Sequence, residues 1–422
     1  MTINFQHKIV NFSFILFLLI PISLISGPFI PDLFLVVIVI NFILLTYFNK
    51  KYELIKNKTS YLFLVFCLII VAVSIFSLNT SSIQSSLFYI RFGLFALATS
   101  VLIEEKKYLL IYILYLLLFT YLALFFDSIY QLKFNENIFG FTVENNLNFR
   151  ITSFFGKDEV LGSYSIRLLP LTIFLTILCF NNSINTKRFL LISMVIASFV
   201  VVVLSGERTS LALFILLIIF LFSSSFNLRK LLLIPIIITS ITFIIVISAS
   251  EKIKHRMIDT TINQLGFSEN SERMVLFSKT YEGHYLIALN MFKEKPIFGH
   301  GAKMFRYYCA KEENFVAPNA CTTHPHNFYA QMLSESGLIG FFFLTTIFLY
   351  IIFLYLKNLY FQLRYKKQFI TDLGLCLLST YFITLFPILP SGNFFNNWIS
   401  IVYYLPLGFY FSTLCQPSKN NI

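Results

Sequence analysis

Charged side chains are scarce in this chain, since Asp, Glu, Lys and Arg make up 12% of its 422 residues while hydrophobic residues make up 57%. This composition lies outside the range of soluble domains and inside that of polytopic membrane proteins. The chain has no phosphate loop or Walker motif, which argues against an ATPase. No Asp-x-Asp or Glu-x-x-His pair in a loop suggests metal-dependent chemistry, and no repeat or low-complexity linker divides the sequence. We therefore expect a single membrane domain over residues 1–422.

Acidic residues are fewer than basic ones, 20 against 32, which leaves a formal net charge of +12. In a soluble protein this excess would suggest a nucleic-acid partner. Here a large share of the Lys and Arg residues lies in short loops between apolar runs, where positive charge sets the orientation in the membrane. We expect membrane lipids around the protein and no nucleic acid.

Apolar runs of about 20 residues, the length that crosses a bilayer, recur along the whole chain. The first of them lacks a small-x-small cleavage site and is followed at once by another run, so we expect it to be retained as a span and not removed as a signal peptide. The sequence predicts an all-α polytopic protein with about twelve transmembrane helices. They are expected at 9–26, 29–48, 60–78, 87–103, 108–126, 161–180, 189–205, 210–226, 231–249, 337–356, 369–389 and 398–414.

The distribution of cations predicts the orientation of these spans. With a cytoplasmic N-terminus, the short loops 79–86 and 390–397 face outward and contain no Lys or Arg. Two longer segments, 127–160 and 250–336, also face outward; they are mixed in charge, and long loops escape the charge rule. The cations that then lie in cytoplasmic connections are Lys50, Lys51, Lys56, Lys58, Lys106, Lys107, Lys187, Arg188, Arg229, Lys230, Lys357, Arg364, Lys366 and Lys367.

The most informative stretch is 321–340, which contains two of the six histidines and runs directly into an apolar span. Pro325 suits the first position of a helix, which would make His324 the cap and His326 a first-turn residue. Positive partial charge at a helix start disfavours imidazolium. We therefore expect His326 to be neutral near pH 7 and able to act as a general base.

Beyond the histidines, residues 328–335 place their apolar side chains on one stripe, which predicts a helix at the membrane interface. Gly337 and Gly340 are expected to mark the turn into the following span. Earlier in the same outer loop, 271–292 has helical apolar spacing that Lys295-Pro296 should end. We expect this loop to be largely helical and folded over the membrane face.

Cys309 and Cys321 are the only cysteines outside the apolar spans. Both lie in a segment expected outside the cell membrane, where thiols can oxidise, so a disulfide is the first interpretation. Closing this short loop should stabilise the fold by roughly 3 kcal/mol. Zinc is the alternative because His324 and His326 are near in sequence, although the spacing matches no common zinc finger.

Two arginines lie at positions that suit anion binding. Arg208 stands in a Ser-Gly-Glu-Arg-Thr-Ser break between two spans, where it is either a snorkelling charge at a helix end or a phosphate ligand. Arg273 begins the expected loop helix and is either a surface residue or a second ligand, and Arg150 in the first outer segment could reach a head group. His284 and His300 are interpreted as surface or packing residues.

Four charged residues, Arg91, Arg167, Asp32 and Asp372, lie within or at the ends of apolar spans. An unpaired charge there costs at least ~2.5–3.5 kcal/mol. We therefore expect each of them either to be paired inside the protein or to line a wet cavity.

These motifs resemble the O-antigen ligase and polymerase superfamily of bacterial inner-membrane proteins. The resemblance covers roughly 140–345 and rests on Ser-Gly-Glu-Arg-Thr-Ser at 205–210, Glu272-Arg273, Lys-Pro-Ile-Phe-Gly-His-Gly-Ala-Lys-Met-Phe at 295–305 and the stretch 324–340. It implies a GT-C-like membrane fold, no metal and no cofactor, and a donor glycan carried on undecaprenyl pyrophosphate. The large loop 250–336 would carry the active site, facing the periplasm.

The resemblance also implies roles for individual residues. His326 matches the family's essential histidine and would take a proton from the acceptor hydroxyl, which attacks the anomeric carbon of the donor with inversion. Arg208 and Arg273 match the arginines that the family uses on the pyrophosphate, and they complete the expected catalytic set. The residues expected to bind substrate are Arg208, Arg273, His324, Asn327 and Arg150.

Three functions remain open from the sequence. The first is an O-antigen ligase, which moves a finished glycan to lipid A-core, and the second is a polymerase of the same superfamily, whose acceptor is another lipid-linked unit. A lipid-linked oligosaccharide flippase is the third, but a transporter is expected to place its functional residues near the bilayer midplane. The candidate residues here gather on one outer face, which favours an enzyme.

Overall fold

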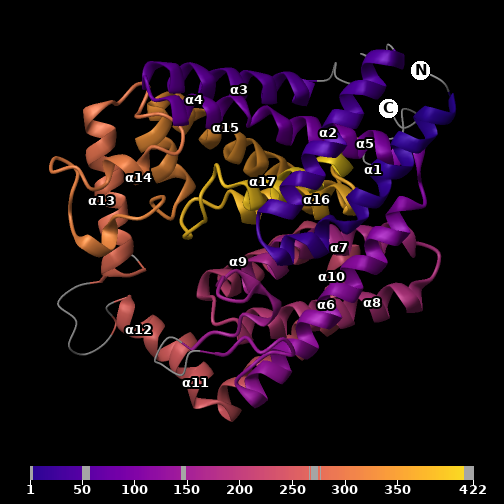
Figure 1. Cartoon of the computed structure of the whole chain (residues 1–422). Coiled ribbons are helices and arrows are strands. Elements are labelled where there is room, and N and C mark those ends of the chain that lie inside the picture. Colours follow the sequence, from indigo (N-terminus) through magenta and orange to yellow (C-terminus); the bar gives the residue numbers. More distant parts are fainter. Residues whose placement is uncertain are drawn as a thin grey trace.

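The computed structural model describes residues 3–49, 58–143, 149–265, 267, 274–275 and 277–412. Within these residues the regular structure is helical apart from one isolated bridge between Glu136 and Thr142. Figure 1 shows the helices gathered into a bundle, with α11 to α14 at its edge. The helices are α1 (Ile3–Ser23), α2 (Phe29–Asn49), α3 (Lys58–Phe76), α4 (Thr80–Leu87), α5 (Ile90–Glu105), α6 (Leu109–Phe134), α7 (Leu161–Cys179), α8 (Ile184–Leu204), α9 (Arg208–Ser224), α10 (Phe226–Ala249), α11 (Glu251–Lys254), α12 (Thr260–Gln264), α13 (Lys279–Glu294), α14 (Phe305–Tyr308), α15 (Phe328–Tyr365), α16 (Asp372–Thr384) and α17 (Asn397–Phe411).

Each of the twelve apolar runs overlaps a helix. In the described part of the chain, nine helical stretches are long and apolar enough to cross a membrane, and α9 and α16 are apolar but shorter. The α4–α5 stretch counts as one of the nine, and α17 has 15 residues. The prediction of an all-α polytopic membrane protein is confirmed.

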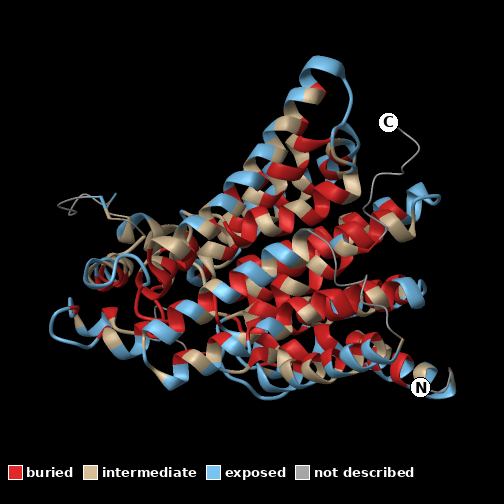
Figure 2. Ribbon diagram, turned by 90° about the horizontal axis from the view of Figure 1, so that it is seen from above, coloured by how far each residue is buried: buried red, intermediate tan, exposed pale blue. Residues whose placement is uncertain are grey.

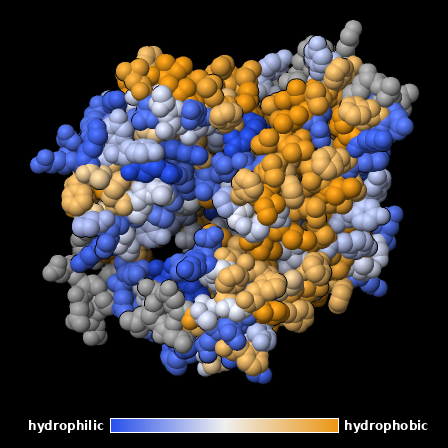
Figure 3. Space-filling view, viewed as in Figure 1, coloured by the Kyte–Doolittle hydropathy of each residue, from blue (hydrophilic) through white to orange (hydrophobic). Residues whose placement is uncertain are grey.

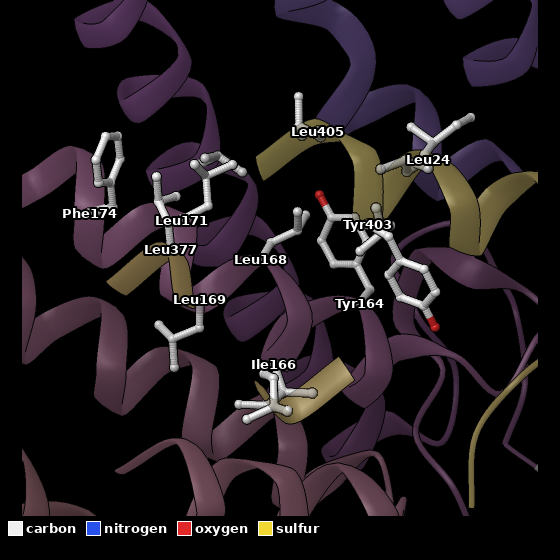
Figure 4. Packing of buried hydrophobic residues seen from close by; sticks show 14 of the residues in the cluster. Leu24, Tyr164, Ile166, Leu168, Leu169, Leu171, Phe174, Leu377, Tyr403 and Leu405 are labelled. Atoms are coloured by element: carbon white, nitrogen blue, oxygen red, sulfur yellow. The ribbon is translucent and has the colours of Figure 1, made fainter. Parts of the chain in front are cut away.

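Helix α7 lies at the centre of the bundle and packs against α6, α8, α9, α16 and α17. All but one of its side chains from Leu161 to Ile177 are buried, and Figure 4 shows Leu168 and Tyr164 beside Leu405 and Tyr403 of α17. By contrast α10 buries few of its residues. Figure 2 shows buried residues filling the middle of the bundle and exposed ones covering its periphery. A charge placed on α7 is therefore surrounded by protein, not by lipid.

Three of the four charges in or at the ends of the apolar spans, Arg91, Asp32 and Asp372, have partners inside the protein, and the fourth, Arg167, lines a cavity. The guanidinium of Arg91 on α5 donates to the carboxylate of Asp32 on α2 at 3.1 Å, and the Asn397 amide of α17 donates to the same carboxylate at 3.0 Å. Asp372, at the start of α16, accepts from the Ser225 hydroxyl at 2.5 Å. These contacts fix the ends of neighbouring helices to one another.

The polar segments occupy one side of the molecule. Figure 3 shows hydrophobic side chains over the helix bundle and polar ones over the side where α13 and α14 lie. Helix α13 begins after its cap Ser278, whose side chain accepts from Tyr281 N–H, and it ends at Glu294. The predicted end before Lys295-Pro296 is thus confirmed. The helix starts later than expected, because residues 274–275 and 277–278 of the expected range 271–292 are not helical, while 271–273 and 276 lie outside the described residues.

Candidate functional site

The turn between α8 and α9 presents Arg208. Gly206 takes a φ of +65°, a conformation that L side chains rarely adopt, and the chain reverses there. Glu207 then accepts hydrogen bonds from the N–H groups of Gly162 at 2.6 Å and Ser163 at 3.0 Å, at the start of α7. A carboxylate is favoured at a helix N-terminus; burial nevertheless raises the pKa of Glu207 to about 7. The turn is therefore attached to the central helix, and Arg208 faces the cavity beside it.

Three arginines meet beside this turn. The guanidinium of Arg208 donates to the Gln264 side chain at 2.5 Å. Arg150 pairs with Glu159, and Arg256, which is 4% exposed, donates through Nε to a backbone oxygen of the α8–α9 turn at 3.3 Å. Burial and the nearby charges of Arg150 and Arg208 lower the pKa of Arg256 to about 10. This arginine group is a concentrated positive potential that suits an anion carrying more than one charge.

Arg273, the other arginine expected on the pyrophosphate, lies outside the described residues. Its role therefore stays a prediction from the sequence.

The histidines form a cluster opposite the arginines. The ring centroids of His324 and His326 are 4.1 Å apart, and those of His284 and His326 are 4.9 Å apart. Tyr281 of α13 packs edge-on against His326 at 5.7 Å. Burial and, to a smaller extent, the neighbouring imidazoles lower the pKa of His326 to about 4 and that of His324 to about 3. Both rings are therefore neutral near pH 7.

The structure corrects the predicted start of the helix at this point. Helix α15 begins at Phe328, not at Pro325, because Asn327 caps it by accepting from the N–H groups of Tyr329 and Ala330. His326 precedes the helix and has a φ of +52°. The main cause of its neutrality is therefore burial, with the neighbouring His284 second, and not the position in the first turn of a helix from which we predicted it.

Asn327 also differs from its expected role in substrate binding. Besides capping α15, its side-chain amide donates to the carbonyl of Pro387 at 2.8 Å, and the residue does not line the cavity. The neighbouring loop is held in the same way, since the Ser391 N–H donates to the carbonyl of His326 at 2.8 Å and Tyr329 Oη donates to the carbonyl of Leu385 at 2.6 Å. These contacts place loop 385–391 beside the histidines.

The first part of α15 is buried within the protein, and its location at the level of the membrane interface stays a prediction. The Glu335 carboxylate accepts from the N–H groups of Lys303 at 3.0 Å and Phe305 at 2.9 Å, and from the Gln331 amide at 2.9 Å. Gln331 in turn binds the Asn393 side chain at 2.9 Å. A non-helical residue, Gly337, then separates this segment from the span, as the sequence predicted.

Cys309 and Cys321 form a disulfide in the structure, with their Cα atoms 5.2 Å apart. Because both thiols are used in this bond, the zinc alternative loses its cysteine ligands. The pair lies in a small core of its own with Ile287, Met291 and Phe305. The disulfide therefore attaches the segment before the histidines to α13 and α14.

His284 and His300 are buried packing residues, one of the two interpretations that the sequence left open. His284 Nδ1 lies 2.6 Å from the carbonyl oxygen of Ala320, and His300 Nε2 lies 2.9 Å from that of Met291. His284 also contacts His326, so it contributes to the environment of the candidate base.

One cavity of about 900 Å³ joins these groups. Its walls come from the α1–α2, α6–α7, α8–α9 and α16–α17 connections and from the long segment between α10 and α15. These are the connections that the sequence places on one side of the membrane, and they share one end of the bundle. The charged and imidazole residues in its lining are Arg150, Asp158, Glu159, Arg167, Glu207, Arg208, Arg256, Arg306, His324 and His326.

Sequence reasoning found part of this lining and missed the rest. The lining includes four residues that we expected to bind substrate or to take the proton: Arg208, Arg150, His324 and His326. Arg167 also lines the cavity, which is one of the two alternatives that we expected for its charge. Among the lining residues without a role in the prediction are Arg256, Arg306 and Tyr281. Arg306 directly follows the 295–305 motif, which was a usable signal, whereas nothing in the pattern around Arg256 distinguished it from a surface cation.

Residues 192–345 match the family model described as O-antigen ligase. A comparison with curated proteins found no match. The matched range contains the α8–α9 turn, the histidine cluster and the first part of α15, but not Arg150 or Arg167. The resemblance that we inferred from the motifs is confirmed over this part of the chain.

Proposed function

We propose that this multi-pass membrane protein, which carries an O-antigen ligase domain at residues 192–345, transfers a glycan from undecaprenyl pyrophosphate to lipid A-core in lipopolysaccharide assembly. The observation that carries the proposal is one cavity in which a neutral histidine pair lies with several arginines. A base for a sugar hydroxyl and cations for a pyrophosphate are the two requirements of such a transfer.

His326 is the proposed general base. Its neutral imidazole accepts the proton of the acceptor hydroxyl while that oxygen forms a bond to the anomeric carbon of the donor. The bond between this carbon and the pyrophosphate oxygen breaks, and the electron pair leaves with undecaprenyl pyrophosphate. Attack from the face opposite the leaving group inverts the anomeric carbon.

The arginine group is the proposed site of the pyrophosphate. Arg208 and Arg256 have their positions fixed by the α8–α9 turn and by Gln264, so their guanidinium groups need little reorganisation when the anion binds. Arg150 lies with them, and Arg273 is proposed on the resemblance alone. Their positive charge would stabilise the negative charge that develops on the leaving oxygen.

The donor itself would strengthen the base. A histidine whose pKa is about 4 is a weak proton acceptor, because burial disfavours its charged form. A bound pyrophosphate places negative charge in the same cavity, which favours imidazolium and raises the pKa. Proton transfer is therefore expected to become favourable only when the donor is in place.

The location of the site fits this enzyme. We propose that the cavity end of the bundle faces the periplasm of a bacterial inner membrane, as the cation distribution predicts. No nucleotide is available there, so the energy for transfer comes from the bond to pyrophosphate. A transporter would instead be expected to place these groups near the middle of the bilayer.

The test is a transfer assay with the purified full-length protein, a lipid-linked donor, and either lipid A-core or a second lipid-linked unit as the acceptor. A ligase uses lipid A-core. If only the second lipid-linked unit accepts the glycan, the protein is a polymerase of the same superfamily, and if neither does, the enzymatic proposal is wrong.

Two matched variants test the roles. His326→Ala should reduce the chemical step by ~10²–10⁴-fold with little change in donor binding. His324→Ala, two residues earlier in the same cluster, should retain more activity because His324 is proposed to bind substrate and not to take the proton. Retained activity in His326→Ala with loss in His324→Ala, at equal protein levels, would reverse this choice of base.

A further inference from the structure

Arg167 is a buried cation whose hydrogen-bonding capacity is not filled by the protein. It lies in α7, the central helix, and is 3% exposed. Its Nε donates to Ser163 Oγ at 3.1 Å and its guanidinium lies 5.5 Å from the centre of the Tyr403 ring, but Nη1 has no hydrogen-bond partner. No carboxylate in the described part of the chain forms an ion pair with it. A buried charge without a counter-charge is costly, and its usual explanation is a ligand.

This arginine lines the same cavity as the arginine group but lies apart from it. Arg167 projects from the middle of α7, whereas Arg208 begins α9 and Arg256 lies in the segment that follows α10. Ser163 connects the two places, because its N–H donates to Glu207 beside Arg208 while its Oγ accepts from Arg167. A group bound at Arg167 would thus be a near neighbour of an anion held by the arginine group.

Two asparagine side chains in the lining of the same cavity offer donors. Asn393 uses its Oδ1 to accept from Gln331 and from the N–H of Phe395, and Asn396 uses its Oδ1 to accept from the N–H of Ile399. No partner is found for either Nδ2 within the described structure. Both residues line the cavity together with Arg167. The subsite is therefore rich in N–H groups and suits a ligand rich in acceptor oxygens.

We propose that Arg167, with Asn393 and Asn396, binds a sugar that bears a carboxylate, so that the glycan handled by this protein is acidic. A guanidinium matches the two oxygens of a carboxylate, and amide N–H groups match the ring hydroxyls beside it. Trp398 also lines the cavity. Its indole N–H donates to the carbonyl of Leu24 at 2.7 Å, and its ring offers an apolar surface. The inference rests on the proposed function, since it concerns the sugar next to the pyrophosphate.

The test measures the binding of sugars and of pyrophosphate to the purified full-length protein in lipid nanodiscs. The first pair of probes is glucuronate and glucose, compared by ligand-observed NMR titration. Wild-type protein should bind glucuronate more tightly than glucose, and Arg167→Gln should weaken glucuronate binding about tenfold or more, the effect of losing a charged hydrogen bond, without changing glucose binding. Arg167→Lys should recover only part of the loss because it lacks the planar fork.

The second probe is inorganic pyrophosphate, which reports on the arginine group. Arg208→Gln should weaken its binding, and Arg167→Gln should leave it unchanged. Equal weakening in the two variants would place Arg167 in the pyrophosphate site and overturn the inference. Unchanged glucuronate binding in Arg167→Gln would overturn it as well.

Folding is controlled in two ways. The midpoint of thermal unfolding should not fall in Arg167→Gln, because a buried charge without a counter-charge is removed. If that variant fails to fold, Asn396→Ala tests the same subsite from an exposed position and should also weaken glucuronate binding; no effect would again count against the inference. Wild-type protein that transfers a lipid-linked glycan but shows no preference for glucuronate would refute this inference alone, whereas absence of both transfer and pyrophosphate binding would refute the proposed function.

Discussion

The pH dependence of transfer tests the state of His326 directly. Its pKa is lowered to about 4, so the imidazole is neutral above that pH and becomes protonated, and unable to accept a proton, as the pH falls through it. At pH 5.5 a histidine with the ordinary pKa of ~6.5 would be only about 9% neutral, whereas one with a pKa of 4 would be about 97% neutral. We therefore expect kcat/KM for the donor to stay nearly constant from pH 7.5 to 5.5.

The profile of kcat should differ from that of kcat/KM. The first reports the enzyme with substrate bound and the second reports the free enzyme. Because the bound pyrophosphate is negative, it favours imidazolium and raises the pKa of His326 in the complex. The acid limb of kcat is thus expected at a higher pH than the acid limb of kcat/KM.

The assay is initial-rate transfer in nanodiscs at constant ionic strength between pH 4.5 and 8.5. A tenfold fall in kcat/KM between pH 7.5 and 5.5 would mean that the base has an ordinary pKa, and the buried cluster could not then be the proton acceptor. His324→Ala is the matched control, because an acid limb that belongs to His326 must persist in that variant. In His326→Ala the residual rate should lose the limb.

Four further outcomes are expected. Cys309→Ser or Cys321→Ser should lower the free energy of unfolding by roughly 3 kcal/mol, measured with and without reductant. Either variant should reduce transfer less than loss of the base does, because the disulfide only orders the segment. Asn327→Ala removes the cap of α15 and should cost about 0.5–2 kcal/mol of stability, with a greater loss if the contact with loop 385–391 also fails. Glu207→Gln keeps one acceptor oxygen for two backbone donors, so it should cost about 1–3 kcal/mol and raise KM for the donor; unchanged KM would contradict the placement of Arg208 by this turn. A topology reporter fused at Lys311 should behave as periplasmic, and a cytoplasmic signal would invert the proposed orientation.

The helices could be predicted because their signals are local. Apolar runs of membrane length predicted where the long helices lie. Lys295-Pro296 predicted the end of α13, because the residue before a proline is disfavoured in the helical conformation. Gly337 gave the break in α15, since its backbone takes a φ of +61° that other residues rarely adopt. Each of these depends on neighbours in sequence, and tertiary contacts did not override them.

The start of α15 depended on contacts that the sequence does not display. His324-Pro325 and Asn327 both carry signals for a helix start. Asn327 becomes the cap, and its amide also reaches the carbonyls of Pro387 and Leu389, more than 50 residues away. The neutrality of His326 was likewise predicted from the helix dipole but is caused mainly by burial, which only the folded cavity provides.

The motif residues that made the family resemblance specific divide into two kinds in the structure. His326 and Arg208 face the cavity, whereas Glu335 turns away from it and binds the N–H groups of Lys303 and Phe305. Through Gln331 the same carboxylate is connected to Asn393. It also binds the N–H of Phe305, which directly precedes Arg306. The positions of the cavity residues Asn393 and Arg306 therefore both depend on this buried acid. Loss of Glu335 would leave two backbone donors and an amide unsatisfied, each at about 1–3 kcal/mol. Glu335 thus serves to place cavity residues. Substituting it should alter substrate affinity and stability together, whereas substituting His326 should alter the rate alone.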